Sequence, residues 1–333
     1  MIISRSPLRV SLFGGGTDFP EWFKKNDGLV IGGTINKYNY IHVRYLPNIF
    51  NFNFRLRYFK TELVKKINNI KHGPYREILK AYDLDKSQIE IIHTSDLPAL
   101  SGLGSSSSST VSAINAISAL KGYFINKKNL SNLAIKIERE ILGENVGYQD
   151  QIFSSFGGFN CIRFKSDVDY TLEGLVNDKK KLTLLSNSSI LIWTGITREG
   201  QILEKEKIKK IKNKLITQNL KNIQSITEKA YEEFSKPNWD LEKIGKFMND
   251  YWNQKKQLSK GITNKKIDEI CKIANKNGAY GVKLLGAGGG GFIYILCSAK
   301  KRKLLLKKLA KFRSVNFQFE NSGSSIIYNK QLV

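Results

Sequence analysis

Residues 101–110, SGLGSSSSST, are the part of the chain that most constrains its fold. The segment before them, IEIIHTSDLP, contains Ile89, Ile91 and Ile92 and predicts a strand that ends near Pro98. The segment after them, VSAINAISALKG, spaces its apolar residues three apart and predicts a helix that stops at Gly122. A strand, a glycine- and serine-rich loop and a helix, in this order, predict a phosphate-binding site.

The physical reason lies in the main chain of such a loop. Glycines let the backbone approach an anion closely, and the first free N–H groups of the helix point at it. The alternative is a flexible linker, because runs rich in serine and glycine are often unstructured coil. We favour the phosphate site because the predicted helix follows the run directly.

The order of the predicted elements bounds the fold class. Strands and helices mix without a regular βα repeat, which indicates an α+β fold. A chain of 333 residues, 41% of them hydrophobic, is long enough for two packed domains. The polar stretch at residues 165–181 predicts a boundary, with domains at 1–170 and 171–333.

The sequence offers no targeting or membrane signal. The opening stretch carries Arg5 and Arg9 and reaches glycines before a long apolar segment develops, unlike a signal peptide. No apolar run approaches the roughly 20 residues that span a bilayer. Three widely separated cysteines are expected to be reduced. We therefore expect a cytoplasmic protein without a membrane partner.

The charge of the chain bears on its partners. A net charge of +25, from 54 Lys and Arg against 29 Asp and Glu, makes nucleic acid the first partner to consider. Many lysines, however, lie in amphipathic stretches such as residues 202–234, which is typical of solvated helix faces. A basic surface also attracts phosphorylated small molecules. We rank an acidic small-molecule substrate above nucleic acid.

A second glycine-rich segment, GAGGGG at residues 286–291, formally matches the dinucleotide fingerprint G-x-G-x-x-G. Its context is wrong for that motif, because it runs into the strand-like FIYILC instead of opening a helix in a βαβ unit. The segment is either a tight connection between two strands or a backbone that packs against a ligand.

A third glycine loop lies near the start of the chain, in PLRVSLFGGGTD. Arg9 falls in a presumed strand, where burial would be costly without an acid or a phosphate as partner. Asp18 follows the glycines. It either caps the helix that starts near Phe19 or accepts hydrogen bonds from sugar hydroxyls.

Two carboxylates are placed for acid–base or metal chemistry. Glu138 falls on a predicted helix at 131–142, and Asp150 lies on the loop GENVGYQDQ beyond it. A carboxylate is a hard oxygen ligand for Mg²⁺ and can accept the proton of a hydroxyl nucleophile. The alternative is that Glu138 is a solvent-facing helix charge and Asp150 a helix cap.

Together and in this order, PLRVSLFGGGTD, PALSGLGSSSSST and KLLGAGGGGF resemble the three motifs of the GHMP kinases, the superfamily of galactokinase and of homoserine, mevalonate and phosphomevalonate kinases. The resemblance spans almost the entire chain. GGGTDFPEW and GENVGYQDQ are most similar to the D-glycero-D-manno-heptose 7-phosphate kinases, and next to fucose-type sugar 1-kinases. The resemblance implies an N-terminal half like ribosomal protein S5, a ferredoxin-like C-terminal half and an active site between them.

The resemblance also implies the cofactors, which are ATP and Mg²⁺. The ATP phosphates would lie on main-chain N–H groups, and Ser106 and Glu138 would hold Mg²⁺. The spacing from Glu138 to Asp150 differs by one residue from that of the family, so Glu140 is the alternative ligand. The expected nucleotide-binding residues are Pro98, Ser101, Gly102, Leu103, Gly104, Ser105, Ser106 and Ser107.

By the same resemblance Asp150 would take the proton from the anomeric hydroxyl of a sugar, and Arg9 would neutralise charge around it. A phosphate already on the substrate would meet Lys37, Arg198 or Lys283, of which we prefer Lys283. The expected contacts to the substrate are Gly15, Gly16, Thr17, Asp18, Lys37, Arg198, Lys283, Gly288 and Gly289.

The hypothesis is an ATP- and Mg²⁺-dependent sugar 1-kinase. It would convert D-glycero-D-manno-heptose 7-phosphate to the 1,7-bisphosphate, which feeds nucleotide-activated heptose for a bacterial surface glycan. One alternative is a fucose-type or other hexose 1-kinase, and the other is a non-catalytic relative or a nucleic-acid-binding protein. We expect a monomer or a homodimer whose partners are ATP and a sugar phosphate.

Overall fold

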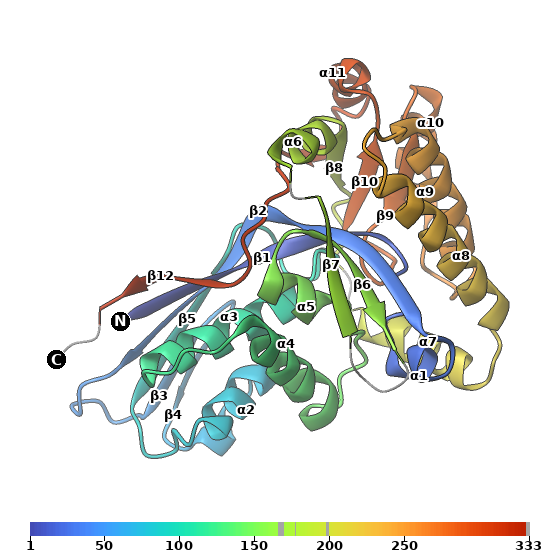
Figure 1. Cartoon of the computed structure of the whole chain (residues 1–333). Helices are drawn as coiled ribbons and strands as arrows, with labels where there is room; N and C mark the ends of the chain where they lie inside the picture. Colours follow the sequence, from blue (N-terminus) through green and yellow to red (C-terminus); the bar gives the residue numbers. More distant parts are fainter. Residues whose placement is uncertain (166–169, 177, 198–199, 331–333) are drawn as a thin grey trace.

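The computed structural model describes residues 1–165, 170–176, 178–197 and 200–330. These residues form two sheets, each with its own set of helices (Figure 1). The first sheet and its helices come mainly from the N-terminal half of the chain, and the second sheet comes from the C-terminal half. The predicted α+β class is confirmed.

The first sheet is built around one long strand, β2 (Gly28–Tyr45). The sequence predicts two strands here, GLVIGGTI and NYIHVRYL, but the structure joins them. One edge of β2 pairs with β1 (Ile2–Phe13), and the other edge pairs first with β6 (Phe159–Phe164) and then with β5 (Ile89–Ser95). The other strands of this sheet are β3 (Phe54–Arg57), β4 (Thr61–Val64), β7 (Tyr170–Val176) and β12 (Ser325–Asn329).

The serine-rich run forms a core helix, α3 (Ser105–Leu120), so the linker alternative is wrong. The helix contacts β1 and β2, and its hydroxyls find partners there: Ser108 Oγ donates to the carbonyl of Ser6 (2.9 Å), and Ser112 Oγ to Ser4 Oγ (3.1 Å). Its neighbours in this half are α1 (Pro20–Asn26), a 3₁₀ turn (Ile67–Asn69), α2 (Gly73–Ala81), α4 (Lys127–Ile135), a π-helical turn (Lys136–Ile141) and α5 (Gln149–Phe156).

The second sheet is antiparallel, with the order β11-β8-β10-β9. In chain order its elements follow a βαββαβ pattern, in which the spatial order of the four strands is 4-1-3-2, the ferredoxin-like arrangement. Its strands are β8 (Ser189–Trp193), β9 (Gly281–Leu284), β10 (Phe292–Leu296) and β11 (Arg313–Val315). The helices between β8 and β9 are α7 (Gln201–Lys212), α8 (Thr217–Phe234), α9 (Leu241–Lys256) and α10 (Lys265–Lys276), α11 (Ala299–Lys308) lies between β10 and β11, and α6 (Lys179–Asn187) precedes β8.

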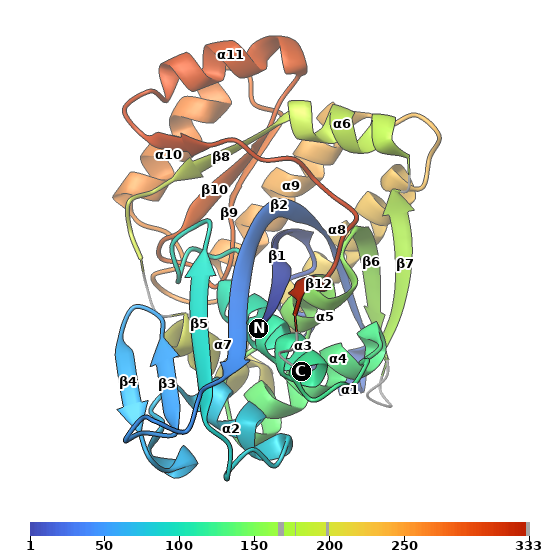
Figure 2. The ribbon, with the colours of Figure 1, turned by 90° about the vertical axis from the view of Figure 1, so that its left-hand side faces the viewer.

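Two elements beyond residue 170 pair in the first sheet. β7 pairs with β6, and β12 pairs with β1, so the described C-terminal end of the chain lies close to the N-terminus (Figure 2). The expected division at residue 170 therefore does not coincide with the division between the two sheets.

Three further expectations about the elements are wrong. The Lys- and Asn-rich sequence that follows NYIHVRYL predicts helix up to about residue 85, but it contains the hairpin of β3 and β4 as well as α2. The reason is that Phe54 and Leu56 alternate with arginines, as in a half-buried strand. Residues 201–276 hold four helices instead of three. The alternating VNFQFE at residues 315–320 predicts a strand, but Val315 ends β11 and Phe319 makes only an isolated bridge to Ile35.

No helix in the described ranges is long and apolar enough to cross a membrane. The three cysteines, Cys161, Cys271 and Cys297, are buried and free, in agreement with the prediction that they are reduced.

Candidate active site

One wall of the candidate site is the loop 101–104 with the first turn of α3. Gly102 and Gly104 have φ values of 82° and 73°, which glycine adopts most easily. The helix begins after Gly104, and Ser108 N donates to the carbonyl of Gly104 (2.9 Å). The N–H groups of residues 105–107 come before this first hydrogen bond of the helix, so they have no acceptor within the helix. They lie at the positive end of the helix dipole. This arrangement suits a phosphate group.

The glycine loop at residues 286–291 packs directly against this wall. A Cβ atom on Gly286 would lie 2.5 Å from Cα of Gly102, and one on Gly291 would lie 2.4 Å from the carbonyl oxygen of Ser101. Phe292 N donates to that same oxygen (3.0 Å). The loop does connect two strands, β9 and β10, but its glycines are needed because the backbones of the two halves meet here.

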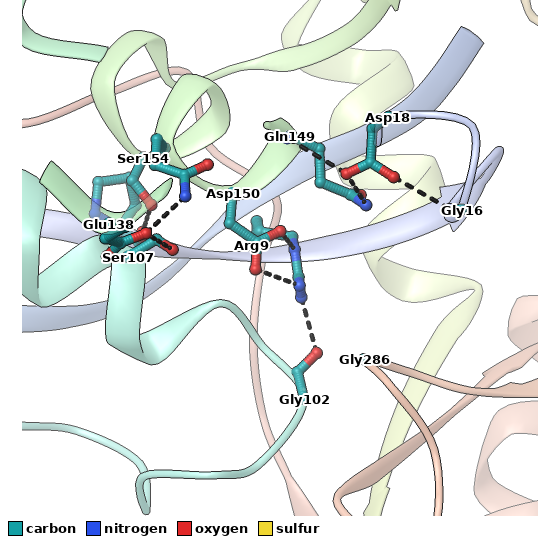
Figure 3. A network of polar contacts seen from close by, with 12 residues as sticks. Arg9, Gly16, Asp18, Gly102, Ser107, Glu138, Gln149, Asp150, Ser154 and Gly286 are labelled. Atoms are coloured by element: carbon teal, nitrogen blue, oxygen red, sulfur yellow. Dashed lines mark hydrogen bonds and ion pairs between the residues drawn. The ribbon is translucent and has the colours of Figure 1, made fainter. Parts of the chain in front are cut away.

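Arg9 and Asp150 form a bidentate ion pair at the centre of the site (Figure 3). Arg9 comes from β1, and its Nε and Nη2 donate to the two carboxylate oxygens of Asp150, each at 2.7 Å. Its third nitrogen, Nη1, donates to the carbonyl of Gly102 (2.7 Å). Arg9 is buried, whereas the side chain of Asp150 is 23% exposed. One guanidinium thus fixes a carboxylate of α5 and the loop before α3 in one geometry.

Asp18 is buried, and it does not cap α1, because the cap position belongs to Phe19 and no side chain caps this helix. The N–H of Gly16 and the amide Nε2 of Gln149 donate to its carboxylate, at 3.0 and 2.9 Å. Burial raises the pKa of Asp18 above its usual value. A Cβ atom on Gly147 would lie 1.9 Å from Asp18 Oδ2, so the segment GENVGYQDQ can approach this carboxylate only with glycine there.

Glu138 faces inward from the π-helical turn and is fully buried. Ser107 Oγ and Gln151 Nε2 both donate to its Oε2 (2.8 and 2.5 Å), while Oε1 accepts no hydrogen bond from any residue that the structure describes. Burial raises the pKa of Glu138 to about 7. Ser106 is exposed beside it, and the alternative ligand Glu140 is also exposed. The solvent-facing interpretation of Glu138 is therefore wrong, whereas it describes Glu140.

These residues suit a magnesium ion that is held partly by a nucleotide. Among the described residues no group of three His, Cys, Asp or Glu side chains could hold a metal alone. Mg²⁺ is commonly bound by one or two carboxylates together with substrate phosphates. The unpartnered Oε1 of Glu138 is a hard oxygen donor close to the expected phosphate site.

The raised pKa of Glu138 predicts a pH-dependent gain in stability for Glu138→Gln. Between the ordinary pKa of 4.5 and about 7, the folded protein binds a proton that the unfolded chain does not, so its stability falls as pH rises through this window. Glutamine carries no such cost, and its carbonyl can accept both hydrogen bonds.

We expect Glu138→Gln to be more stable than the wild type at pH 8, by on the order of 3 kcal/mol, and nearly equal to it at pH 4.5. Unfolding curves in buffer with a chelator measure the difference. A difference between the two proteins that is the same at both pH values would contradict the prediction.

A cavity of about 230 Å³ lies between these walls. The expected residues that line it are Arg9, Gly15, Gly16, Asp18, Ser101, Gly102, Gly104, Ser105, Ser106, Ser107, Asp150, Lys283 and Gly288.

Other expected residues lie away from the cavity surface. Leu103 is part of the hydrophobic core, Pro98 is exposed, and the hydroxyl of Thr17 donates to the carbonyl of Gly14 (2.8 Å) and so shapes the first glycine loop. Glu138 lies behind Ser107. Lys37 and Gly289 are likewise not among the lining residues, and Arg198 lies outside the described residues.

Sequence reasoning missed several residues of the cavity wall, among them Gln149, Lys207, Tyr251 and Lys255. One of them, Lys255, could have been noticed in the sequence. Lys255 continues the buried stripe of α9 formed by Met248, Tyr251 and Trp252, and a lysine at such a position calls for an explanation. Gln149 had none, because its contact with Asp18 joins residues far apart in the sequence.

The chain is similar to known proteins over both of its halves. Residues 67–158 match the N-terminal domain of the GHMP kinases, and residues 231–314 match their C-terminal domain. The D-glycero-alpha-D-manno-heptose 7-phosphate kinase of Campylobacter jejuni is 31% identical, with 97% of each chain covered. The bifunctional fucokinase/GDP-fucose pyrophosphorylase of Arabidopsis thaliana is 23% identical, over 91% of this chain and 30% of the plant protein.

The fold is also similar to solved structures. The crystal structure of a D-glycero-D-manno-heptose 1-phosphate kinase from Bacteroides thetaiotaomicron superposes with a TM-score of 0.79 at 22% identity, covering 99% of this chain and 100% of the other. GHMP kinases use ATP as phosphate donor. The chain belongs to the GHMP kinases and is a sugar kinase, a phosphotransferase with an alcohol group as acceptor.

Proposed function

We propose that the protein transfers the γ-phosphoryl group of ATP to the anomeric hydroxyl of D-glycero-D-manno-heptose 7-phosphate and so forms the 1,7-bisphosphate. The observation that carries this assignment is the 31% identity to the heptose 7-phosphate kinase of Campylobacter jejuni over nearly the full length of both chains. The product would enter the synthesis of nucleotide-activated heptose for a bacterial surface glycan.

In the proposed reaction Asp150 is the general base. Its carboxylate takes the proton of the anomeric hydroxyl, the hydroxyl oxygen attacks the γ-phosphorus, and the bond from that phosphorus to the bridging oxygen of ADP breaks. Arg9 holds the carboxylate in place through its bidentate contact and adds positive charge near the transferring group. Phosphoryl transfer depends mainly on such positioning and charge neutralisation, and these are the two roles that Asp150 and Arg9 would fill.

The phosphates of ATP would lie on the N–H groups of residues 102–107, at the start of α3. Glu138 and the hydroxyl of Ser106 would hold Mg²⁺, which when bound neutralises phosphate charge. Gly15, Gly16 and Asp18 line the cavity beside Asp150 and would contact sugar hydroxyls. The buried carboxylate of Asp18 already accepts hydrogen bonds from main chain and side chain, and it could accept one from a hydroxyl in the same plane.

The cellular setting follows from the same assignment. We propose that the enzyme acts in the cytoplasm, where its substrates ATP and a sugar phosphate are found, as a monomer or homodimer. Nucleic acid is not expected as a partner, because many of the excess lysines lie on amphipathic helices such as α8 and α9, whose other faces are buried.

A panel of acceptors tests the substrate. We expect ATP-dependent turnover with D-glycero-D-manno-heptose 7-phosphate, and a kcat/KM about 30- to 150-fold lower with the same heptose lacking the phosphate, because a charged contact contributes on the order of 2–3 kcal/mol. A coupled assay for ADP gives the rates, and phosphorus NMR of the product identifies the 1,7-bisphosphate.

A fucose-type or other hexose 1-kinase is the second candidate, and the similarity to the plant fucokinase favours it. L-Fucose and other free hexoses therefore belong in the same panel. If a free hexose is turned over faster than the heptose phosphate, the heptose assignment is wrong and the second candidate replaces it.

A further inference from the structure

The cavity is lined by four cations and four carboxylates, but they are not evenly paired. Arg9 is held by Asp150, and Lys207 is held by Glu204 of the same helix. The other two cations, Lys255 and Lys283, have no carboxylate within ion-pair distance among the described residues. Both are almost completely buried, with exposures of 5% and 1%. A buried charge without a counter-charge is costly and needs an explanation.

Lys255 reaches the cavity from the end of α9. Its Nζ donates to the carbonyl of Gly286 (2.5 Å) and, at the longer distance of 3.4 Å, to that of Leu284. An ammonium has a third N–H, and no acceptor in the described part of the chain takes it. Burial lowers the pKa of Lys255 to about 7, and the nearby charge of Lys207 acts in the same direction.

Lys283 comes from β9 and enters the same wall. Its Nζ donates to the carbonyls of Ser11 (2.8 Å) and Leu12 (2.7 Å) in β1, and it lies 4.1 Å from the centre of the Tyr251 ring. Burial lowers the pKa of Lys283 well below its usual value, and Lys255 is the next largest cause. Lys283 and Lys255 thus line the same cavity, and the charge of Lys255 makes protonation of Lys283 less favourable.

These contacts fix both lysines, and those of Lys255 leave one N–H of its ammonium unused by any described residue. Main-chain carbonyls hold each Nζ in place without neutralising it, as would be required of a preformed anion site. An anion between the two would supply the missing counter-charge and take the unused N–H of Lys255. Gly286, whose carbonyl binds Lys255, abuts Gly102 of the phosphate loop, so the site adjoins the reaction centre (Figure 3).

We propose that Lys255 and Lys283 together form a binding site for a phosphoryl group, separate from the N–H groups at the start of α3. The proposal rests on the proposed function as far as the source of that group is concerned. The bound phosphoryl group is either the phosphate that the sugar already carries or the γ-phosphoryl group during transfer. The proposed site contains Lys283, which was expected to meet the substrate's phosphate, and adds Lys255. Lys37, another expected cation, does not line the cavity and is not part of the site.

The test uses Lys255→Met and Lys283→Met, which keep most of the side-chain volume and remove the charge. If the phosphate of the sugar occupies the site, KM for heptose 7-phosphate rises by about tenfold or more in each variant, while turnover of the phosphate-free heptose stays within about twofold. If the γ-phosphoryl group occupies it, kcat falls by a similar factor with both acceptors. Either result supports the site, and unchanged KM and kcat in both variants would overturn it.

A binding measurement distinguishes failure of the lysine site from failure of the proposed function. Inorganic phosphate should raise the Tm of the wild type, because a ligand that binds only the folded state stabilises it. The two variants should lose part of this rise even if no heptose proves to be a substrate. If phosphate raises the Tm of both variants as much as that of the wild type, the lysine site is wrong, and the proposed function is unaffected.

Two controls accompany the variants. Lys256→Met makes the same change at the neighbouring residue of α9, which does not line the cavity, and should leave every one of these values unchanged. The Tm without ligand, measured for each variant, shows whether the variant folds.

Discussion

Asp150→Asn lowers kcat by about 10²–10⁴-fold and leaves KM for ATP within a few-fold of the wild-type value. The amide has the shape of the carboxylate but cannot take the proton of the acceptor hydroxyl. It also breaks one arm of the contact with Arg9, because its NH₂ group would face an N–H of the guanidinium. Steady-state kinetics with saturating ATP and sugar phosphate measure the effect.

A matched control is Asp178→Asn. Asp178 also lies at the start of a helix, where its carboxylate accepts a hydrogen bond from Lys180 N (2.8 Å), but it does not line the cavity. Asparagine caps helices about as well as aspartate, so activity and Tm should stay near the wild-type values. Sugar-dependent turnover by Asp150→Asn at close to the wild-type rate would show that another group is the base.

The part of the site that sequence could predict is local. The strand β5, the loop 101–104 and the helix α3 follow each other directly, and the periods of their apolar residues differ enough to identify each element. The helix begins at Ser105, where the sequence predicts it, and the buried serines of its first turns bond to β1 and to other core groups. Short-range patterns of this kind need no knowledge of the rest of the fold.

The parts that sequence could not predict depend on distant partners. The return of β12 to the edge of β1 joins residues that are more than three hundred positions apart in the chain. Likewise, Glu138 was ambiguous on its own, because a helix charge faces solvent or the core depending on what packs against it. Ser107 and Gln151 make it an inward-facing group, and neither contact leaves a trace in the spacing of residues.

The two buried lysines of the cavity could likewise be predicted only in part, because their contacts join distant parts of the chain. Lys283 could be singled out because it precedes a glycine loop, but its two carbonyl partners lie in β1, at the other end of the chain. Lys255 interrupts an apolar stripe, which marks the position as unusual without saying what it faces. Only the packing of α9 against β9 brings the two ammonium groups to one wall.

Arg9→Met should lower kcat by about 10³-fold, since a cation close to a transferring phosphoryl group contributes on that order in related chemistry. Two further effects add to the lost charge: Asp150 is no longer oriented, and the carbonyl of Gly102 loses its donor, so the base and the phosphate loop are no longer tied together. The fold should survive, because the carboxylate left behind is 23% exposed and can be solvated. Arg9→Lys should recover little, because one ammonium cannot reach both oxygens of Asp150 and the carbonyl with the geometry of the fork.

The double variant Arg9→Met with Asp150→Asn decides whether the pair acts as a unit. If Arg9 works mainly by orienting Asp150, the double variant should be about as slow as the slower single variant, because either change already removes the positioned base. Losses that multiply would mean that Arg9 acts on the phosphoryl group independently of Asp150, and the ion pair in the structure would then be a resting contact that opens before transfer. The four kcat values of this cycle, measured with the Tm of each protein as a check on folding, distinguish the two roles.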